Sequence, residues 1–194
     1  METVYSARAE LRLARPFYQQ SALTIARQLL GKGLVHRVNG AVRVGRIVET
    51  EAYLGRRDLA SHASKGLTRR TEVLFGPAGH AYVYFIYGMH CCFNVVGGPE
   101  GIGGAVLVRA VEPLEGVPEG ARTDGPGRLC RALGITLEHN REDLLGKRLY
   151  IVDLNSTSSL RIQRGPRVGV DYSGIWAKKP YRFWIRGNAF VSSK

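Results

Sequence analysis

Short runs in which apolar and polar residues alternate dominate the chain, and this pattern predicts β-strands. Two such runs, 33–38 and 42–54, flank an Asn-Gly turn, so we expect them to pair as a β-hairpin. Enrichment in Val, Ile, Tyr and Phe predicts two further strands within 80–98, with the chain reversing at 87–89. More strands are expected at 104–113 (ending at Pro113), 148–154, 166–172 and 181–187.

Helical spacing is limited to two segments. Apolar residues recur every three or four positions from Leu23 to Leu30, and Ser21 can cap the start of this helix. A Pro-Gly pair opens a second, short helix within 124–135. The polar, basic segment 56–79 predicts a surface loop with one short helical turn.

Strands outnumber helices and do not alternate with them, which excludes a doubly wound sheet. We therefore predict the α+β class, with a mainly antiparallel curved β-sheet, flanking helices and a protruding β-hairpin. No internal repeat or low-complexity linker divides the chain, so residues 1–194 are expected to form a single domain.

The charge balance adds a partner to this picture. Lys and Arg number 28 against 16 Asp and Glu, which gives a net charge of +12, and 22 of the 28 cations are Arg. Arg forks onto phosphate oxygens and stacks on bases, so we expect contact with nucleic acid. A basic enzyme or a ribosome-associated protein is the alternative.

The patterns of cysteine, histidine and hydropathy argue against disulfide-rich, metal-binding and membrane proteins. The three cysteines, with Cys91 and Cys92 adjacent, show no disulfide framework, which favours a reducing cytoplasm. The five histidines form no zinc spacing with them, and no Gly-rich phosphate loop occurs, so we expect no metal and no cofactor. No leader pattern or apolar run of about 18 residues is present, so no membrane partner is expected.

Two carboxylates and a phenol share one face of the strand at 48–54. Glu49, Glu51 and Tyr53 are two residues apart, and a strand points such residues to one side. The simplest interpretation is a solvated face with the intervening residues packed inward. However, Thr50 and Ala52 form only a weak core stripe, and acids on a surface that meets phosphate would repel it.

A general base is the second interpretation of these acids. A carboxylate that activates water works best when a neighbouring arginine keeps it ionised and orients the water. Arg46 and Arg109 are the candidates, and Arg109 lies alone in the apolar run 106–111. A lone arginine in such a strand is more often a buried ion-pair partner than a catalytic group, although one residue can do both.

Aromatic residues suggest a base-binding wall. Tyr82 and Tyr84 share one strand face, and aromatic faces suit a nucleobase drawn out of a duplex. Half-buried packing in the sheet is the alternative. Tyr87 lies at the expected hairpin tip with the bulky Met89 close by, which suits a wedge between stacked bases, although a tip aromatic can also fold back onto the sheet.

Five blocks carry a family resemblance: RIVETEAYLG followed by SHAS, then YVYFIYGMHCCFNVV, VLVRAVEPLEG, GPGRLCRALGI and RVGVDYSGIWAKKPYRFWIRG. Together they make the chain resemble the alkyladenine (3-methyladenine) DNA glycosylases, the monofunctional base-excision enzymes of the mammalian methylpurine-glycosylase type. The match runs in order from about Pro16 to near the C-terminus. Ordered blocks of this length are far more specific than a short motif.

The resemblance implies roles in the chemistry. Glu51 matches the family's general base, which activates the attacking water, and Arg109 matches the arginine that helps to hold this water. Glu49 has no catalytic counterpart, which implies a structural role. The implied reaction is hydrolysis without strand cleavage and without metal or organic cofactor, on damaged double-stranded DNA, by a monomer.

The resemblance also implies how the base is bound. Tyr53 and Tyr84 match the aromatic walls that sandwich the flipped base, and His62 matches the histidine that faces its edge. Asn94 matches the asparagine that discourages undamaged guanine. The lesion range among 3-methyladenine, 7-methylguanine, hypoxanthine and ethenoadenine is left open.

The hairpin tip is where the chain departs from its family. Tyr87 matches the intercalating residue, and we place Met89 beside it in the DNA. His90 stands where mammalian members have an aromatic residue, which puts base-opening strength and lesion range in doubt. The expected location is the cytoplasm, at the nucleoid in a bacterium, or the nucleus in a eukaryote. A non-catalytic nucleic-acid-binding module, or an enzyme that acts on RNA or free nucleosides, remains an alternative.

Overall fold

The structure, a computed structural model, describes residues 11–86, 88–155 and 160–192. In these residues eight strands form one sheet, in which β3, β4, β5, β2, β1 and β6 follow one another and β8 pairs with both β2 and β7. All pairings are antiparallel. The strands are β1 Gly33–Val38, β2 Ala41–Leu54, β3 Ala81–Ile86, β4 His90–Val96, β5 Gly104–Glu115, β6 Leu149–Val152, β7 Ile162–Gly165 and β8 Arg182–Ile185.

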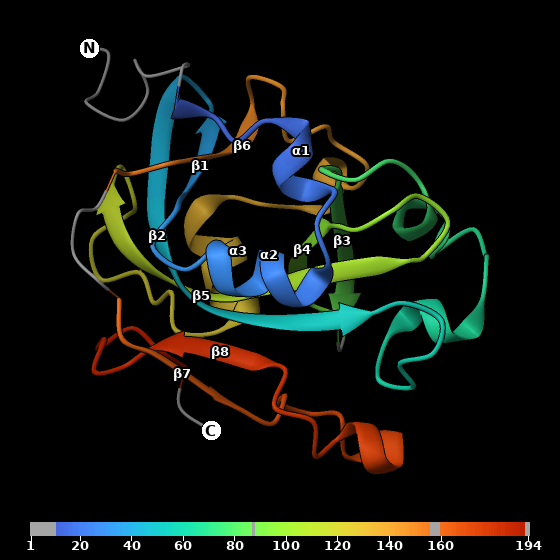
Figure 1. Cartoon of the computed structure of the whole chain (residues 1–194). Helices are drawn as coiled ribbons and strands as arrows, with labels where there is room; N and C mark the ends of the chain where they lie inside the picture. Colours follow the sequence, from blue (N-terminus) through green and yellow to red (C-terminus); the bar gives the residue numbers. More distant parts are fainter. Residues whose placement is uncertain (1–10, 87, 156–159, 193–194) are drawn as a thin grey trace.

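Short helices lie within and beside the curled sheet (Figure 1). The α-helices are α1 Arg15–Tyr18, α2 Ala22–Gln28 and α3 Pro126–Leu133, and the 3₁₀ helices are η2 His62–Lys65, η3 Glu72–Phe75, η4 Leu137–His139 and η5 Asp171–Trp176. Ser21 caps α2 as predicted, because its side chain accepts a hydrogen bond from the Thr24 amide. The predicted α+β class, with a mainly antiparallel curved sheet and flanking helices, is confirmed.

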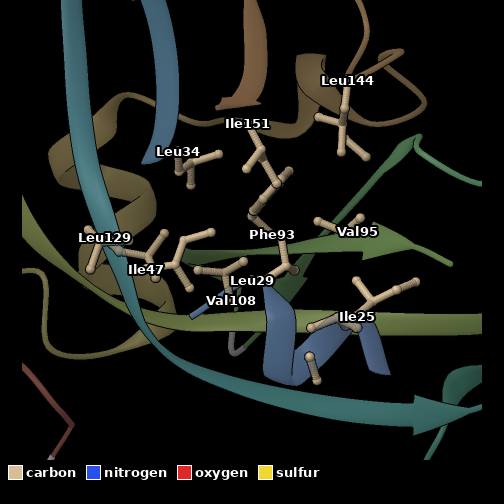
Figure 2. Packing of buried hydrophobic residues seen from close by; sticks show 14 of the residues in the cluster. Ile25, Leu29, Leu34, Ile47, Phe93, Val95, Val108, Leu129, Leu144 and Ile151 are labelled. Carbon is tan, nitrogen blue, oxygen red and sulfur yellow. The ribbon is translucent and has the colours of Figure 1, made fainter. Parts of the chain in front are cut away.

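The main core fills the concave side of the sheet. Figure 2 shows Ile25 of α2 and Leu29, which caps the end of that helix, packed against Ile47, Phe93 and Val108 from three strands. All five side chains are fully buried. One face of the sheet is therefore committed to apolar packing, and polar chemistry is left to the other face.

β2 is the central element, because it pairs with β1, β5 and β8. Its inward-facing Thr50, expected to be a poor core residue, donates a hydrogen bond of 2.7 Å to the Ala26 carbonyl of α2. A small polar residue at this point satisfies a helix carbonyl and lets α2 lie close to the sheet. The strand thus holds the helix with one face and presents Glu49, Glu51 and Tyr53 on the other.

Two strand predictions were wrong. The strand β5 continues past Pro113 to Glu115, because the register slips between Val44 and Gly45, and a proline is tolerated at such a bulge. Residues 166–172 do not form a strand. The chain bends at Gly169, whose φ of +72° is incompatible with a strand, and then enters η5.

Candidate active site

Strand register brings the predicted site residues to one face of the sheet. Glu51 lies opposite Leu107 of β5, and Leu107 lies opposite Asn94 of β4. Asn94 in turn lies opposite Tyr82 of β3. Side chains in register on neighbouring strands point to the same face, and so do residues two positions along each strand. That rule adds Tyr53, Tyr84, Cys92, Ala105 and Arg109.

A cavity of about 460 Å³ opens over this face. Five predicted site residues line it, and these are Tyr53, His62, Tyr84, Asn94 and Arg109. Side chains of η2 and of the segment that includes Val168 and Tyr172 complete the wall. The volume lies within the range of small-molecule sites, roughly 300–1,000 Å³, so the cavity has room for a purine base.

Glu51 is fully buried just behind this lining and contacts three of the groups that form it. Its Oε2 accepts a hydrogen bond of 2.8 Å from the Tyr53 hydroxyl, and its Oε1 accepts one of 2.7 Å from the Val168 amide. Arg109 Nη1 lies 3.3 Å from Oε1. The interpretation of this strand segment as a solvated face is therefore wrong for both glutamates, since Glu49 is fully buried as well.

Glu49 has a different set of partners. It accepts four hydrogen bonds, from Arg109 Nε (2.9 Å), Arg182 Nε (2.7 Å), the Ser192 amide (2.7 Å) and the Ser192 hydroxyl (2.9 Å). These donors come from β5, β8 and the segment after β8. Glu49 therefore ties the C-terminal part of the chain to the centre of the sheet.

Acceptor capacity separates the two glutamates. An ionised carboxylate offers about four lone-pair sites. Glu49 accepts four hydrogen bonds, three of them at Oε1, whereas Glu51 accepts one at each oxygen and has the more distant Arg109 guanidinium at Oε1. Glu51 therefore has more free acceptor capacity, and all three of its contacts line the cavity, whereas of the partners of Glu49 only Arg109 does. The geometry thus favours Glu51 as the general base and Glu49 as support.

Of the two arginine candidates, only Arg109 reaches the carboxylates. Arg46 instead forms an ion pair of 3.0 Å with Glu112. Burial alone would lower the pKa of Arg109, but the facing Glu51 and Glu49 outweigh it and raise the pKa above its usual value. Arg109 is therefore a permanent cation, and it combines the ion-pair role with a place in the cavity wall.

The aromatic groups in the wall are neutral. Burial first, and then the charge of Glu51, raises the pKa of Tyr53 well above its usual value, so the phenol keeps the proton that it donates to Glu51. Burial likewise raises the pKa of Tyr84. Burial and the positive charge of Arg70 lower the pKa of His62 to about 4. At neutral pH the cavity thus presents uncharged rings.

Tyr82 also belongs to the cavity wall, although the sequence placed it only on the same strand face as Tyr84 and gave it no specific role. It lines the cavity, and its hydroxyl lies 2.8 Å from His62 Nδ1. The His62 ring meets the Tyr84 ring edge to face, with centroids 4.6 Å apart. The shared strand face of Tyr82 and Tyr84 was the available signal. Asn94 is held next to them by a 3.1 Å bond from its Nδ2 to the Tyr82 carbonyl.

A buried ion pair that the sequence did not indicate supports the opposite wall. Arg167 binds both carboxylate oxygens of Asp58, and both side chains are inaccessible to solvent. Its guanidinium carbon lies 4.7 Å from the centroid of the Tyr53 ring. Asp58 also accepts the amides of Leu54 and Ala60. This pair fixes Tyr53 and sets the position of the neighbouring Val168 amide.

The hairpin β3–β4 carries the predicted intercalating residues. Tyr87 lies outside the described residues, so its role stays a prediction. Met89 is 67% exposed and Phe85 is 48% exposed, so the described part of the hairpin end is apolar and accessible. His90 packs against Gly127 of α3, where a Cβ atom would lie 2.9 Å from that of His90. It therefore joins the hairpin to α3.

Metal-binding clusters and membrane-spanning helices are both absent from the part of the chain that the structure describes. Across 11–86, 88–155 and 160–192, His, Cys, Asp and Glu side chains do not gather in groups of three or more that could hold a metal ion. No helix in that part of the chain is long and apolar enough to cross a membrane.

Comparison with known proteins identifies the family of the chain. The chain matches the sequence profile of the methylpurine-DNA glycosylase (MPG) family over residues 16–189. A protein of Myxococcus xanthus (strain DK1622) is 59% identical over 180 residues, which cover 93% of each chain. One of Anaeromyxobacter sp. (strain Fw109-5) is 55% identical over 94% of this chain and 93% of its own. One of Legionella pneumophila (strain Corby) is 51% identical over 93% and 98%.

All three relatives carry the provisional name 3-methyladenine DNA glycosylase. The profile match extends over most of the chain, and the relatives align along nearly their whole lengths. The residues that build the cavity from β2, β3, β4 and β5 all lie inside the matched range. The chain belongs to the methylpurine-DNA glycosylase family.

Proposed function

We propose that this protein hydrolyses the N-glycosidic bond of alkylated or deaminated purines, such as 3-methyladenine, after the base has turned out of duplex DNA. This is the first step of base excision repair. The observation that carries the proposal is the spare acceptor capacity of Glu51, a buried carboxylate directly behind a base-sized cavity with tyrosine walls. A module that only binds nucleic acid has no use for such a group.

The cavity binds the extruded base by stacking. Tyr53 of β2 and Tyr84 of β3 offer aromatic faces, and stacking of a base on such faces is worth about 1–3 kcal/mol. His62, whose ring meets that of Tyr84 edge to face, faces the edge of the base. This offsets part of the few kcal/mol that unstacking costs, and damaged or mispaired bases open more cheaply. Tyr87 and Met89 at the hairpin tip fill the gap in the duplex, and Asn94 disfavours undamaged guanine.

Glu51 directs the chemistry. A water molecule donates a hydrogen bond to its free lone pair, and Arg109 orients the same water. The water oxygen attacks C1′ of the sugar, its proton passes to Glu51, and the electron pair of the C1′–N bond leaves with the base. The developing oxocarbenium charge on the sugar is stabilised by the negative charge of Glu51 in a water-poor site. The described residues that line the cavity include no lysine, so the reaction forms no covalent bond to an amine and does not cleave the strand.

Damaged double-stranded DNA is the proposed partner. The net charge of +12 attracts the phosphate backbone without reading sequence, and such binding weakens as salt rises. The proposed active unit is a monomer, because one cavity with one general base completes the reaction. The proposed location is the cytoplasm, at the DNA.

Replacing Glu51 tests the proposal. In Glu51→Gln, release of 3-methyladenine from methylated duplex should fall about 10²–10⁴-fold, the range for loss of a general base, while duplex binding changes little. Glu112→Gln is the matched control, since Glu112 is an ion-paired glutamate of β5 that pairs with Arg46, outside the cavity. It should release the base at the wild-type rate. Near wild-type release by Glu51→Gln would remove Glu51 as the base, and DNA binding without release by the wild type would favour a binding module.

A further inference from the structure

Arg70 is a charged residue at the mouth of the cavity. It lies in the segment between η2 and η3, and its side chain is solvent-exposed yet lines the cavity. Its guanidinium carbon lies 5.4 Å from the centroid of the Tyr84 ring. The arginine therefore stands beside one of the two walls between which the base is proposed to bind.

The charge of Arg70 is not balanced by an acid. Of the basic residues around the cavity, Arg109 faces Glu49 and Glu51, and Arg167 binds Asp58. Within the residues described, Arg70 takes part in no ion pair with a carboxylate. As far as the described residues show, the charge of Arg70 at the cavity mouth is thus uncompensated.

We propose that Arg70 is a specificity-determining residue that shifts the preference of the cavity from purines carrying a positive charge toward neutral ones. The inference rests on the proposed function. Purines alkylated at N3 or N7 in DNA, such as 3-methyladenine and 7-methylguanine, are cations, whereas hypoxanthine is neutral. Like charges a few ångströms apart repel, so the cationic base enters this cavity at a cost that the neutral base does not meet.

Competition for the tyrosine face acts in the same direction. A cation over an aromatic ring is attracted by the negative π-face. Arg70 already uses this attraction at Tyr84. A cationic purine that stacks on Tyr84 shares the negative π-system with this guanidinium and so gains less, whereas the dispersion and hydrophobic part of stacking does not depend on the charge of the purine.

The electrostatic field of Arg70 extends to His62, a neighbouring residue in the wall of the base site. After burial, the charge of Arg70 is the second cause that lowers the pKa of His62 to about 4. A positive charge on His62 and one on a bound base occupy adjacent positions in the same cavity. The field that disfavours protonated His62 also disfavours a cationic base.

The test compares two lesions in one duplex sequence, one with 7-methylguanine as the cationic base and one with hypoxanthine as the neutral base. For each protein the ratio of kcat/KM on the cationic lesion to that on the neutral lesion is measured at about 0.1 M salt. Taking this ratio cancels changes in folding and in general affinity for phosphate, which affect both duplexes equally. The salt concentration matters because exposed charges are screened over roughly 10 Å.

Three variants separate charge from packing. Arg70→Gln should raise the ratio about threefold to tenfold, the size of one partly screened like-charge contact. Arg70→Lys keeps the charge and should stay within about twofold of the wild type. Arg69→Gln removes the same charge from the adjacent exposed residue, which does not line the cavity, and should leave the ratio unchanged.

The outcomes are distinct. An unchanged ratio in Arg70→Gln, or an equal rise in Arg69→Gln, would overturn the inference while base release by the wild type upheld the proposed function. A rise in Arg70→Lys equal to that in Arg70→Gln would also overturn it, because shape rather than charge would then set the preference. If the wild type released neither these two bases nor 3-methyladenine, the proposed function would fall, and the inference with it. Release of cationic bases alone would overturn the inference and leave the proposed function standing.

Discussion

Glu49→Gln separates the two buried glutamates by their contacts. Oε1 of Glu49 accepts from Arg109, Arg182 and the Ser192 hydroxyl, whereas Oε2 accepts only from the Ser192 amide. A glutamine does least harm when its oxygen replaces Oε1 and its NH₂ group replaces Oε2. The new NH₂ group then faces the Ser192 amide as donor against donor, at a position where 2.7 Å separated the original pair.

The expected cost is large because the site is dry. Breaking a buried ion pair by removing one partner costs about 3–5 kcal/mol, since the remaining charge stays buried. Arg182 has 6% of its side chain exposed and contacts no other carboxylate among the ion pairs of the described residues. A loss of about 3 kcal/mol would lower the Tm of a chain of this size by roughly 6–12 °C.

Urea unfolding measures this loss, and hydrogen exchange locates it. The amide of Ser192 should lose its protection in Glu49→Gln, whereas in Glu51→Gln it should keep it. Below the melting temperature, the folded Glu49→Gln variant should release base within about tenfold of the wild-type rate. If its stability were unchanged, or if its rate fell as far as that of Glu51→Gln, the division of roles between the two glutamates would be refuted.

Two further predictions concern single contacts and pH. Tyr53→Phe removes the hydroxyl that donates the 2.8 Å hydrogen bond to Glu51 but keeps the aromatic ring. Single-turnover release of the base should slow about tenfold to a hundredfold at unchanged KM, because one hydrogen bond to a charged group is lost. Tyr84→Phe leaves that hydrogen bond intact and should not slow the release. His36 and His139 form a buried pair with their Nε2 atoms 2.8 Å apart, and burial lowers the pKa of both. The unfolded chain therefore binds more protons than the folded chain below about pH 6.5, and the free energy of unfolding should fall as the pH drops beneath that value. His36→Gln should make this fall smaller. A free energy of unfolding that does not change with pH in the wild type would contradict the prediction.

The alternation of side chains between the two faces of each strand could be predicted from the sequence, and it identified most of the residues of the site. The two-residue spacing of Glu49, Glu51 and Tyr53 placed them on one face, and the same rule placed Tyr82 with Tyr84. Strand register then follows from pairing, so the neighbours of Glu51 across β5 and β4 lie on that face as well. The two-residue repeat of side chains along a strand is a local property, so the sequence shows it directly.

Contacts made by the backbone or by distant loops could not be predicted. The Val168 amide that binds Glu51 belongs to a bend, and the alternating residues around it wrongly indicated a strand. The pairing of Arg167 with Asp58 joins segments separated by 109 residues. Nothing in the spacing of either residue indicates its partner, because loop conformation depends on the packing of the finished fold.

Glu49 explains how Glu51, the proposed general base, can lie beside an arginine and still accept a hydrogen bond. An arginine facing a single carboxylate tends to bind both of its oxygens through two parallel hydrogen bonds. Here Arg109 points Nε at Glu49, at 2.9 Å, and only Nη1 reaches Glu51, at 3.3 Å. Because Glu49 holds the guanidinium in this orientation, Arg109 supplies a positive charge to Glu51 without occupying its lone pairs. Two glutamates, Arg109 and Arg182 make a buried group of equal positive and negative charge. We therefore expect Glu51 to act at the sugar, as proposed, while the excess of arginines elsewhere meets the phosphates.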